Sequence, residues 1–295
     1  MKVLVTGAGG FVGRALLRAL EARHEAIAFD RELGGAPGIE GDLCDASVIA
    51  RALATGCEAI VHLATVPGGA AELDPMLAWR VNVEAARSLL DAAARMPRPP
   101  FVVYASSIAV FCDPLPTPID EDAPVAPTLL YGAHKAMMET WITTLVRRGS
   151  LRGVALRLPG IVARPAAPAG LKSAFLSDVF HALLHKRSID LPVSSDSTTL
   201  LMSVDRVAGN LLHAIESGAS GVITLPASFV RMSDLVASIA RQTGADAALV
   251  RWRPDPAIEA RFGRFPPLST PRAEALGFSA DHDRDELVRS ALASL

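Results

Sequence analysis

The chain has 295 residues, of which 50% are hydrophobic and 20% are charged, and its formal net charge at pH 7 is −2. Such a balance gives no electrostatic reason to expect nucleic acid or an anionic membrane surface as a partner. The three cysteines, Cys44, Cys57 and Cys112, lie far apart without metal-ligand spacing, which predicts reduced thiols in a cytoplasmic protein and no metal site. No signal peptide is predicted, because the N-terminus runs directly into a strand pattern, and no membrane span is predicted, because the longer apolar stretches are broken by charges or prolines.

The first thirty residues contain an apolar strand at 3–5, a glycine turn at 7–13, a helical pattern at 14–23 and a second strand at 26–29. Gly7 permits the tight turn, Gly9 or Gly10 lets a pyrophosphate approach the backbone, and Gly13 lets the helix pack closely on the strand. The helix N-terminus attracts phosphate. Asp30, 17 residues after Gly13, can accept both hydroxyls of an adenosine ribose. This order predicts dinucleotide binding, although a turn that only tightens the join between strand and helix would use the same glycines.

Strand and helix patterns continue to alternate to about residue 160. Short β-branched segments at 59–63, 101–105 and 154–158 predict buried strands, and amphipathic patterns predict helices from a cap at Asp45 to about 53, at 78–95 and at 132–146. This alternation predicts an α/β fold with a Rossmann-like, doubly wound parallel sheet. Ligands of such a sheet lie at the carboxyl ends of its strands.

The pattern changes after Pro165. Helices are predicted at 171–185, 203–217, 233–243 and from Asp283 onwards, with a strand at 221–225, an irregular stretch at 191–197 and a proline-rich region in between. We interpret residues 1–165 as a dinucleotide-binding domain. Residues 166–295 are interpreted as a small C-terminal α/β substrate lobe that is not an independent domain.

A second motif, Tyr131-Gly-Ala-His-Lys135, starts the helix predicted at 132–146. A spacing of four places Tyr131 and Lys135 on one helical face. A free tyrosine has a pKa of about 10 and is a poor base at neutral pH, but a lysine ammonium beside it favours the phenolate. Ser106 and Ser107 follow the strand at 101–105, and Ser107 precedes Tyr131 by 24 residues, enough for a loop to bring its hydroxyl beside the phenol. Ser107, Tyr131 and Lys135 are therefore the predicted catalytic residues, although an amphipathic tyrosine on a surface helix would give the same spacing.

With these motifs, nearly the whole chain resembles the extended short-chain dehydrogenase/reductase family, also called the NAD-dependent epimerase/dehydratase family. The motifs that carry the resemblance are Thr6-Gly-Ala-Gly-Gly-Phe-Val-Gly13, Gly41-Asp-Leu43, His62-Leu-Ala64, Asn82-Val83, Tyr104-Ala-Ser-Ser107, Tyr131-Gly-Ala-His-Lys135 and Arg157-Leu-Pro-Gly160. The resemblance implies NAD as the cofactor. It also implies that Asp42 and Leu43 flank the adenine, that Ala64 lines the cofactor groove, and that Lys135 binds the nicotinamide ribose while assisting Tyr131.

The full set of predicted NAD-binding residues combines the glycine motif with the family positions. They are Gly7, Gly9, Gly10, Phe11, Val12, Gly13, Asp30, Arg31, Asp42, Leu43, Leu63, Ala64, Thr65, Asn82, Ala105, Ser106, Tyr131, Lys135, Pro159 and Ile161. Structural roles remain open for two of them, since Asp42 could be a turn residue and Asn82 a structural amide inside a helix. We expect His62 to be a satisfied histidine at a strand end and His134 to face solvent.

Within the family, the chain is similar to dehydrogenases of four-carbon sugar acids, in the segments 104–111, 155–165, 210–213, 250–256 and 272–278, with Cys112 in place of a common glycine. This implies oxidation of the 2-hydroxyl of a small hydroxy acid, bound between the end of the sheet and the C-terminal lobe, and a homodimer built on the helices at 78–95 and 132–146. The predicted substrate-binding residues are Thr65, Ser107, Tyr131, Arg164, Ser173 and Thr199, with Lys172 and Thr198 as further candidates for the carboxylate.

Two other functions remain open. Nucleotide-sugar epimerases and dehydratases of this family carry an arginine for the diphosphate where this chain has Thr199, although Arg164 or Arg231 could substitute. The third possibility is a protein that senses NAD(P) without catalysis. Such a protein would have no reason to keep serine, tyrosine and lysine together at catalytic spacing.

Overall fold

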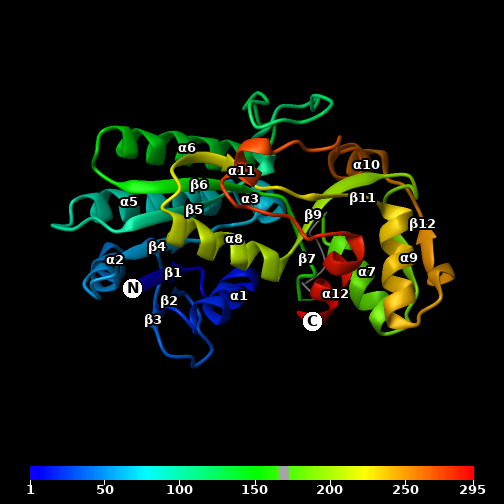
Figure 1. Ribbon diagram of the computed structural model, residues 1–295, viewed down its shortest axis with the longest axis horizontal. Helices are drawn as coiled ribbons and strands as arrows, with labels where there is room; N and C mark the ends of the chain where they lie inside the picture. Colours follow the sequence, from blue (N-terminus) through cyan, green and yellow to red (C-terminus); the bar gives the residue numbers. More distant parts are fainter. Residues whose placement is uncertain (166–172) are drawn as a thin grey trace. The chain divides into compact units, whose positions relative to one another are not determined.

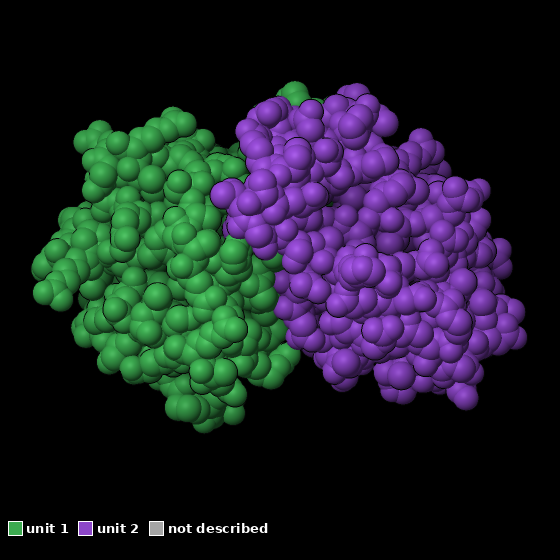
Figure 2. All heavy atoms as spheres, in the orientation of Figure 1, with its two compact units in different colours: residues 1–113, 124–158, 208–224 green, residues 114–123, 159–207, 225–295 purple. Residues whose placement is uncertain are grey.

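The computed structural model describes residues 1–165 and 173–295, which divide into the two compact units coloured in Figure 2. The first unit comprises Met1–Asp113, Pro124–Leu158 and Ala208–Thr224, and the second comprises Pro114–Ala123, Pro159–Val207 and Leu225–Leu295. The chain therefore changes unit after residue 158 rather than after 165, and it returns to the first unit at 208–224. That the second unit binds the substrate stays a prediction.

The first unit contains a seven-stranded parallel sheet of order β10-β6-β5-β4-β1-β2-β3 (Figure 1). Its strands are β1 (Lys2–Thr6), β2 (Glu25–Asp30), β3 (Ile39–Glu40), β4 (Ala59–His62), β5 (Phe101–Ser107), β6 (Arg152–Leu158) and β10 (Gly221–Thr224). The five strands predicted before residue 160 are confirmed. The predicted strand at 221–225 is β10, but it does not belong to the C-terminal lobe, because it pairs in parallel with residues 154–157 of β6.

Helices flank this sheet. They are α1 (Phe11–Leu20), α2 (Ala46–Leu53), α3 (Gly68–Leu73), α4 (Pro75–Trp79), the π-helical η1 (Arg80–Ala85), α5 (Ala86–Ala94), the 3₁₀ turn η2 (Ile108–Val110), α6 (Leu130–Arg147) and the part of α8 (Val204–Ser217) from Ala208 onwards. The helix predicted at 78–95 is thus a run of α4, η1 and α5. The predicted cap of α2 is confirmed, since the Asp45 carboxylate accepts a hydrogen bond from Ser47 N.

One hydrophobic core of the first unit joins α2, α5 and α6 to the sheet. Leu89 and Leu90 of α5, Met138 of α6, and Ile60 and Val102 of the central strands are all buried in it. A guanidinium–carboxylate contact of 3.1 Å links Arg23, in the turn after α1, to Glu216 of α8, and Figure 1 shows these two helices near each other. The core fixes the positions of the strand ends that carry the candidate site.

The second unit has a three-stranded sheet, β11-β9-β7, and a two-stranded sheet, β12-β8. Its strands are β7 (Gly160–Val162), β8 (Ile189–Leu191), β9 (Thr198–Ser203), β11 (Ser228–Arg231) and β12 (Val250–Trp252). Its helices are α7 (Phe175–Leu184), α9 (Met232–Thr243), the 3₁₀ turn η3 (Ala247–Leu249), α10 (Pro256–Phe262), α11 (Pro271–Ala275) and α12 (Arg284–Ala293), in addition to the start of α8. The helices predicted at 203–217, at 233–243 and from Asp283 onwards are confirmed as α8, α9 and α12. The helix predicted at 171–185 corresponds to α7, and its first two residues lie outside the described residues.

Over the described parts of the chain, no helix combines the length and the apolar character that a bilayer-spanning segment needs.

Candidate functional site

The glycine turn between β1 and α1 lies at the carboxyl edge of the sheet. The strand order reverses at β1, because β2 and β3 lie on one side of it and β4, β5 and β6 on the other. Gly7 has φ +72°, a conformation that glycine adopts without strain. A Cβ on Gly13 would lie 2.2 Å from the Gly7 carbonyl oxygen, so only glycine fits where α1 approaches the turn. No side chain caps the N-terminus of α1, which starts after Gly10. Its first backbone N–H groups are therefore suited to a phosphate.

Asp30 ends β2 beside this turn. Its Oδ2 accepts a hydrogen bond of 2.8 Å from Gly9 N, and its Oδ1 accepts one of 2.6 Å from Arg31 N. Because Glu32 N is also 3.4 Å from Oδ1, backbone donors hold the carboxylate in one orientation. A carboxylate has about four acceptor positions, so it can still accept from a ribose hydroxyl. The turn and Asp30 together fit the adenosine diphosphate part of NAD.

The next predicted residues follow β4 at the same edge. The Thr6 hydroxyl oxygen accepts from Leu63 N at 3.2 Å and from Ala64 N at 3.3 Å, which fixes the start of this segment. The buried Asn82 amide bonds to both Val66 N and Val66 O, and its oxygen accepts from the Thr65 hydroxyl at 3.0 Å. These bonds give Asn82 the structural role that the sequence left open. A cofactor contact of Asn82 stays a prediction.

Asp42 and Leu43 follow β3. Asp42 Oδ1 accepts from Cys44 N at 2.8 Å, as a turn residue does, while Leu43 is buried in the core. Phe11 and Val12, in the first turn of α1, are half-buried, and the Arg31 side chain is exposed. Their contacts with adenine or ribose stay predictions.

The three predicted catalytic residues come from the end of β5 and the start of α6. Ser107 is the last residue of β5, and its Oγ accepts from Ala109 N at 3.1 Å. A Cβ on Gly132 would lie 2.1 Å from Ala109 O, so the first turn of α6 packs closely against η2, directly after Ser107. Tyr131 is in that turn. The fold therefore brings Ser107 and Tyr131 to one place at the edge of the sheet.

Lys135 lies one turn further along α6 and is 2% exposed. Its ammonium donates to Ala105 O at 2.7 Å and lies 5.5 Å from the Tyr131 ring centroid and 4.8 Å from that of Tyr104. Burial lowers the pKa of Lys135 to about 7, while the negative charge of Glu139 acts in the opposite direction. An ammonium under the tyrosine ring in a dry site is the arrangement that stabilises a phenolate.

One buried residue beside the site, Glu139, was not singled out from the sequence. Glu139, on α6, bonds to Ser106 and to Arg157 of β6, and all three side chains are buried. The sequence feature that could have indicated Glu139 is its spacing of four residues from Lys135, which places both on one face of the helix. It was missed because a glutamate in a helix usually faces solvent.

Of the two histidines, one behaves as predicted. His62 is buried, its Nδ1 lies 2.8 Å from the Thr6 hydroxyl, and burial lowers its pKa to about 3, so it is a satisfied neutral residue at the end of β4. The prediction for His134 is wrong, since it is 4% exposed. Its ring packs edge-on against Trp79 at 5.8 Å, which covers the face of α6 that we expected in solvent.

Several predicted residues belong to the second unit. Pro159 and Ile161 lie at β7, and Thr199 is buried in β9 opposite Val230. Arg164 N donates to Ser177 Oγ at 3.0 Å, and Ser173 precedes α7. Lys172 lies outside the described residues. The roles of these residues towards NAD or substrate stay predictions.

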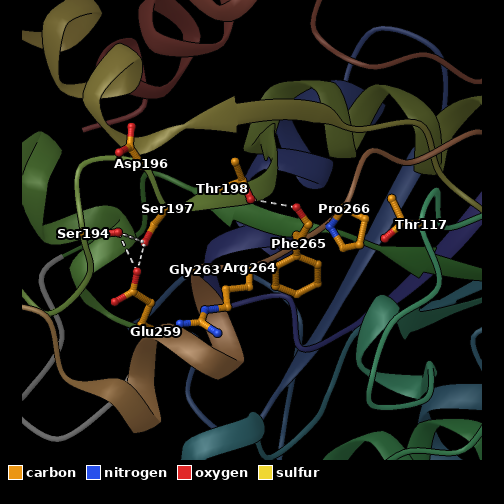
Figure 3. Close-up of a pocket in the computed structure, with 10 residues that line it drawn as sticks. All are labelled: Thr117, Ser194, Asp196, Ser197, Thr198, Glu259, Gly263, Arg264, Phe265 and Pro266. Atoms are coloured by element: carbon orange, nitrogen blue, oxygen red, sulfur yellow. Dashed lines mark hydrogen bonds between the residues drawn. The ribbon is translucent and has the colours of Figure 1, made fainter.

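The second unit also contains a polar pocket of about 410 Å³ (Figure 3). Glu259 Oε1 accepts from the hydroxyls of Ser194 at 2.5 Å and Ser197 at 2.9 Å. The Arg264 guanidinium, which is not among the residues predicted from the sequence, lines the same pocket and has no hydrogen bond or ion pair with the described residues. Of the described residues predicted to bind the substrate carboxylate, only Thr198 lines this pocket. Chemically, such a pocket offers a guanidinium to an anion and a carboxylate to hydroxyl groups.

Among the described residues, no cluster of three or more His, Cys, Asp or Glu side chains is suited to hold a metal ion.

A parallel doubly wound sheet, a glycine turn with an acidic residue on the neighbouring strand, and a Tyr-Lys pair at the sheet edge define an NAD-dependent oxidoreductase of the short-chain dehydrogenase/reductase class. Residues 3–224 match the model of the NAD-dependent epimerase/dehydratase family. The chain belongs to this family, and NAD is its cofactor.

Among curated proteins, the chain is 32% identical to a D-erythronate dehydrogenase from Cupriavidus necator, over 98% of this chain and 97% of that protein. It is 28% identical to a D-erythronate dehydrogenase from Haemophilus influenzae, over 98% of each. Among solved structures, the nucleoside-diphosphate-sugar epimerase from Agrobacterium tumefaciens superposes with a TM-score of 0.87 at 28% identity, covering 98% of this chain and 92% of that one.

Proposed function

We propose that this protein oxidises the 2-hydroxyl of a small sugar acid, D-erythronate or a close analogue, to the 2-oxo acid by a Ser-Tyr-Lys mechanism. The observation that carries the proposal is the similarity to two D-erythronate dehydrogenases, which extends over 98% of this chain in both cases. The positions of Ser107, Tyr131 and Lys135 support the mechanism, because the acceptor of a proton, a donor to the substrate oxygen and a buried cation come together at the edge of the sheet.

Each of the three side chains has a separate task. The Tyr131 phenolate oxygen accepts the proton of the substrate hydroxyl, the Ser107 hydroxyl donates to the same substrate oxygen, and the Lys135 ammonium stabilises the phenolate. NAD, when bound, supplies the acceptor for the hydride of the carbon that is oxidised. Proton removal and hydride loss together convert the secondary alcohol into a ketone.

A nucleotide-sugar epimerase is the second candidate, favoured by the similarity to proteins such as a UDP-glucose 4-epimerase from Azospirillum brasilense. That similarity, at 33% identity, covers only 57% of this chain. The diphosphate arginine expected for such enzymes is a threonine here, Thr199, and its side chain is buried. Arg231, one possible substitute, pairs with Asp196 at 3.4 Å. These features make the sugar-acid dehydrogenase the better supported of the two.

A substrate comparison tests the proposal. NADH absorbance is followed with D-erythronate, other four- to six-carbon aldonates and simple hydroxy acids, and epimerisation of UDP-glucose is assayed in parallel. We expect NADH formation with D-erythronate or a related aldonate and no epimerisation. Turnover of the UDP-sugar without oxidation of any aldonate would establish the second candidate instead.

We predict that Asp30 makes the enzyme prefer NAD over NADP. The 2′-phosphate of NADP would lie against the Asp30 carboxylate, which the backbone holds in place, and two negative groups in contact weaken binding. The Asp30→Ala variant should therefore show a smaller ratio of kcat/KM for NAD to kcat/KM for NADP than the wild-type enzyme. A wild-type preference for NADP, or an unchanged ratio in the variant, would contradict this role.

We also propose a homodimer that uses α5 and α6. Ala85, Leu89 and Ala93 are buried in the core, but Met137 and Trp141 of α6 are 45% and 36% exposed, which leaves an apolar face on this helix. Light scattering at micromolar concentration should give twice the chain mass of 31.0 kDa. Met137→Glu should yield monomers, whereas Phe229→Glu, at an equally exposed phenylalanine on β11, should leave the dimer intact. A monomeric wild-type protein would rule the dimer out.

A further inference from the structure

A buried ion pair lies directly behind the predicted catalytic residues. Glu139 Oε1 accepts from Arg157 Nε at 3.0 Å, and Glu139 Oε2 accepts from Arg157 Nη2 at 2.9 Å, so the contact is bidentate. The Ser106 hydroxyl donates a third hydrogen bond, of 2.5 Å, to Glu139 Oε1. Glu139 is 4% and Arg157 is 7% exposed. Both oxygens of a buried carboxylate are thus satisfied within the protein, and its ionised form is the one that accepts all three bonds.

The sheet register explains why these residues meet. Ser106 of β5 and Arg157 of β6 are direct partners in the parallel ladder, so their side chains leave the sheet on the same face. Glu139 lies four residues after Lys135 and eight after Tyr131, and the three side chains therefore follow one another along one face of α6. Ala105, the neighbour of Ser106, provides the carbonyl that holds Lys135. Ala105 and Ser106, consecutive on β5, thus bond to Lys135 and Glu139, which lie on consecutive turns of α6.

We propose that Glu139 is a positioning residue, whose buried carboxylate, held by Arg157 and Ser106, keeps the Lys135 ammonium charged beneath the Tyr131 ring. Glu139 does not itself contact substrate in this scheme. The proposal rests on the Ser-Tyr-Lys mechanism proposed above. It adds Glu139 as the group that stabilises the charged form of the buried Lys135. Without a nearby negative charge, a buried lysine tends to lose its proton and would then no longer stabilise a phenolate.

The other titratable groups around Lys135 do not provide this charge. His62 of β4 is neutral, since burial lowers its pKa to about 3, and Tyr104 of β5 is neutral because burial raises its pKa well above 10. His134, on α6, has a pKa lowered by burial, and Tyr131 is the acceptor that Lys135 serves. Arg157 is itself a cation. Glu139 lies one turn after Lys135 on α6 and bonds to Ser106, the neighbour of the Ala105 that holds Lys135, and its charge raises the pKa of Lys135 against the effect of burial.

The test is a direct titration of Lys135 in the whole protein. The chain contains only four lysines, Lys2, Lys135, Lys172 and Lys186, so a sample labelled with ¹³C and ¹⁵N at lysine gives few side-chain signals. The Lys135 signal is assigned by its loss in Lys135→Arg. In Glu139→Gln, we expect the midpoint of the Lys135 titration to fall by about one pH unit or more. An unchanged or higher midpoint in a folded variant would overturn the proposal.

Three further variants control this result. Glu139→Gln leaves Arg157 buried without its partner and can fail to fold, so the double variant Glu139→Gln/Arg157→Met, which removes both charges, is measured as well and should also show a lower midpoint. Glu139→Asp keeps the charge and should lie closer to wild type than Glu139→Gln. Glu25→Gln, the same change at an exposed position on β2, should leave the Lys135 midpoint where it is.

The activity of Glu139→Gln provides the second readout. If Lys135 must be charged for turnover, the fall of kcat at high pH should move to lower pH by the same amount as the Lys135 midpoint. If the Lys135 midpoint shifts in Glu139→Gln but the pH profile of kcat does not, the proposed effect of Glu139 on catalysis is contradicted. The titration needs no substrate. A lower midpoint without oxidation of any aldonate would therefore refute the proposed substrate and leave the electrostatic role of Glu139 intact.

Discussion

Replacing Tyr131 by phenylalanine should lower kcat for the oxidation of the sugar acid by about 100- to 10,000-fold. Phenylalanine keeps the ring over Lys135 but lacks the oxygen that accepts the substrate proton. The ring lies 5.5 Å from the Lys135 ammonium, so the variant preserves the packing of this turn of α6. The rate is measured from NADH formation at saturating concentrations of NAD and acid.

The affinity for NADH should remain close to wild type in Tyr131→Phe, because the glycine turn and Asp30 are unaffected. Calorimetric titration with NADH serves as the control for folding and cofactor binding. A variant that binds NADH normally and retains most of its kcat would show that another group transfers the proton. The mechanism with Ser107 and Lys135 would then have to be abandoned.

The second large effect is expected for Gly13→Ala. The new Cβ would clash with three backbone atoms of the turn, at 2.2 Å from Gly7 O and 2.7 Å from both Ala8 Cα and Ala8 O. Because backbone cannot move aside as a flexible side chain does, α1 must shift away from the turn, at a cost of roughly 1–3 kcal/mol in the free energy of unfolding. The same shift displaces the N–H groups intended for the pyrophosphate and should weaken NAD binding.

Urea denaturation and calorimetric titration with NAD measure the two effects of Gly13→Ala. Gly209→Ala is a matched control, since a Cβ at this position of α8 has no neighbour within 4 Å. It should leave NAD binding unchanged and keep or slightly raise stability, because alanine favours a helix over glycine. Equal stability and NAD affinity in Gly13→Ala and wild type would contradict the close approach of helix and turn.

The parts of the fold that follow from local patterns could be predicted from the sequence. The glycines from Gly7 to Gly13, the apolar strands and Asp30 are consecutive in the chain, and the physical reason for each lies within thirty residues. The pairing of β10 with β6 is different. Residues 221–224 meet 154–157 across a long connection, and nothing in the segment itself says which sheet it joins.

The candidate site shows the same limit. Tyr131 and Lys135 could be recognised because they lie on one helix, but Glu139 acquires its meaning only from Ser106 and Arg157, which are 33 and 18 residues away. His134 was expected in solvent because its contact with Trp79 is also long-range. Arg264 could not be chosen among many arginines until the fold placed it beside Glu259 in a pocket.

The most direct test of the central claim uses D-erythronate that carries deuterium at C2. The enzyme is incubated with this substrate and NAD, and the NADH formed is isolated and its deuterium content is measured by mass spectrometry. We expect the deuterium to be transferred to the nicotinamide, and we expect Tyr131→Phe to form this product far more slowly. Unlabelled NADH, or no NADH from any aldonate in a protein that epimerises UDP-glucose, would contradict oxidation of a sugar acid at its 2-hydroxyl.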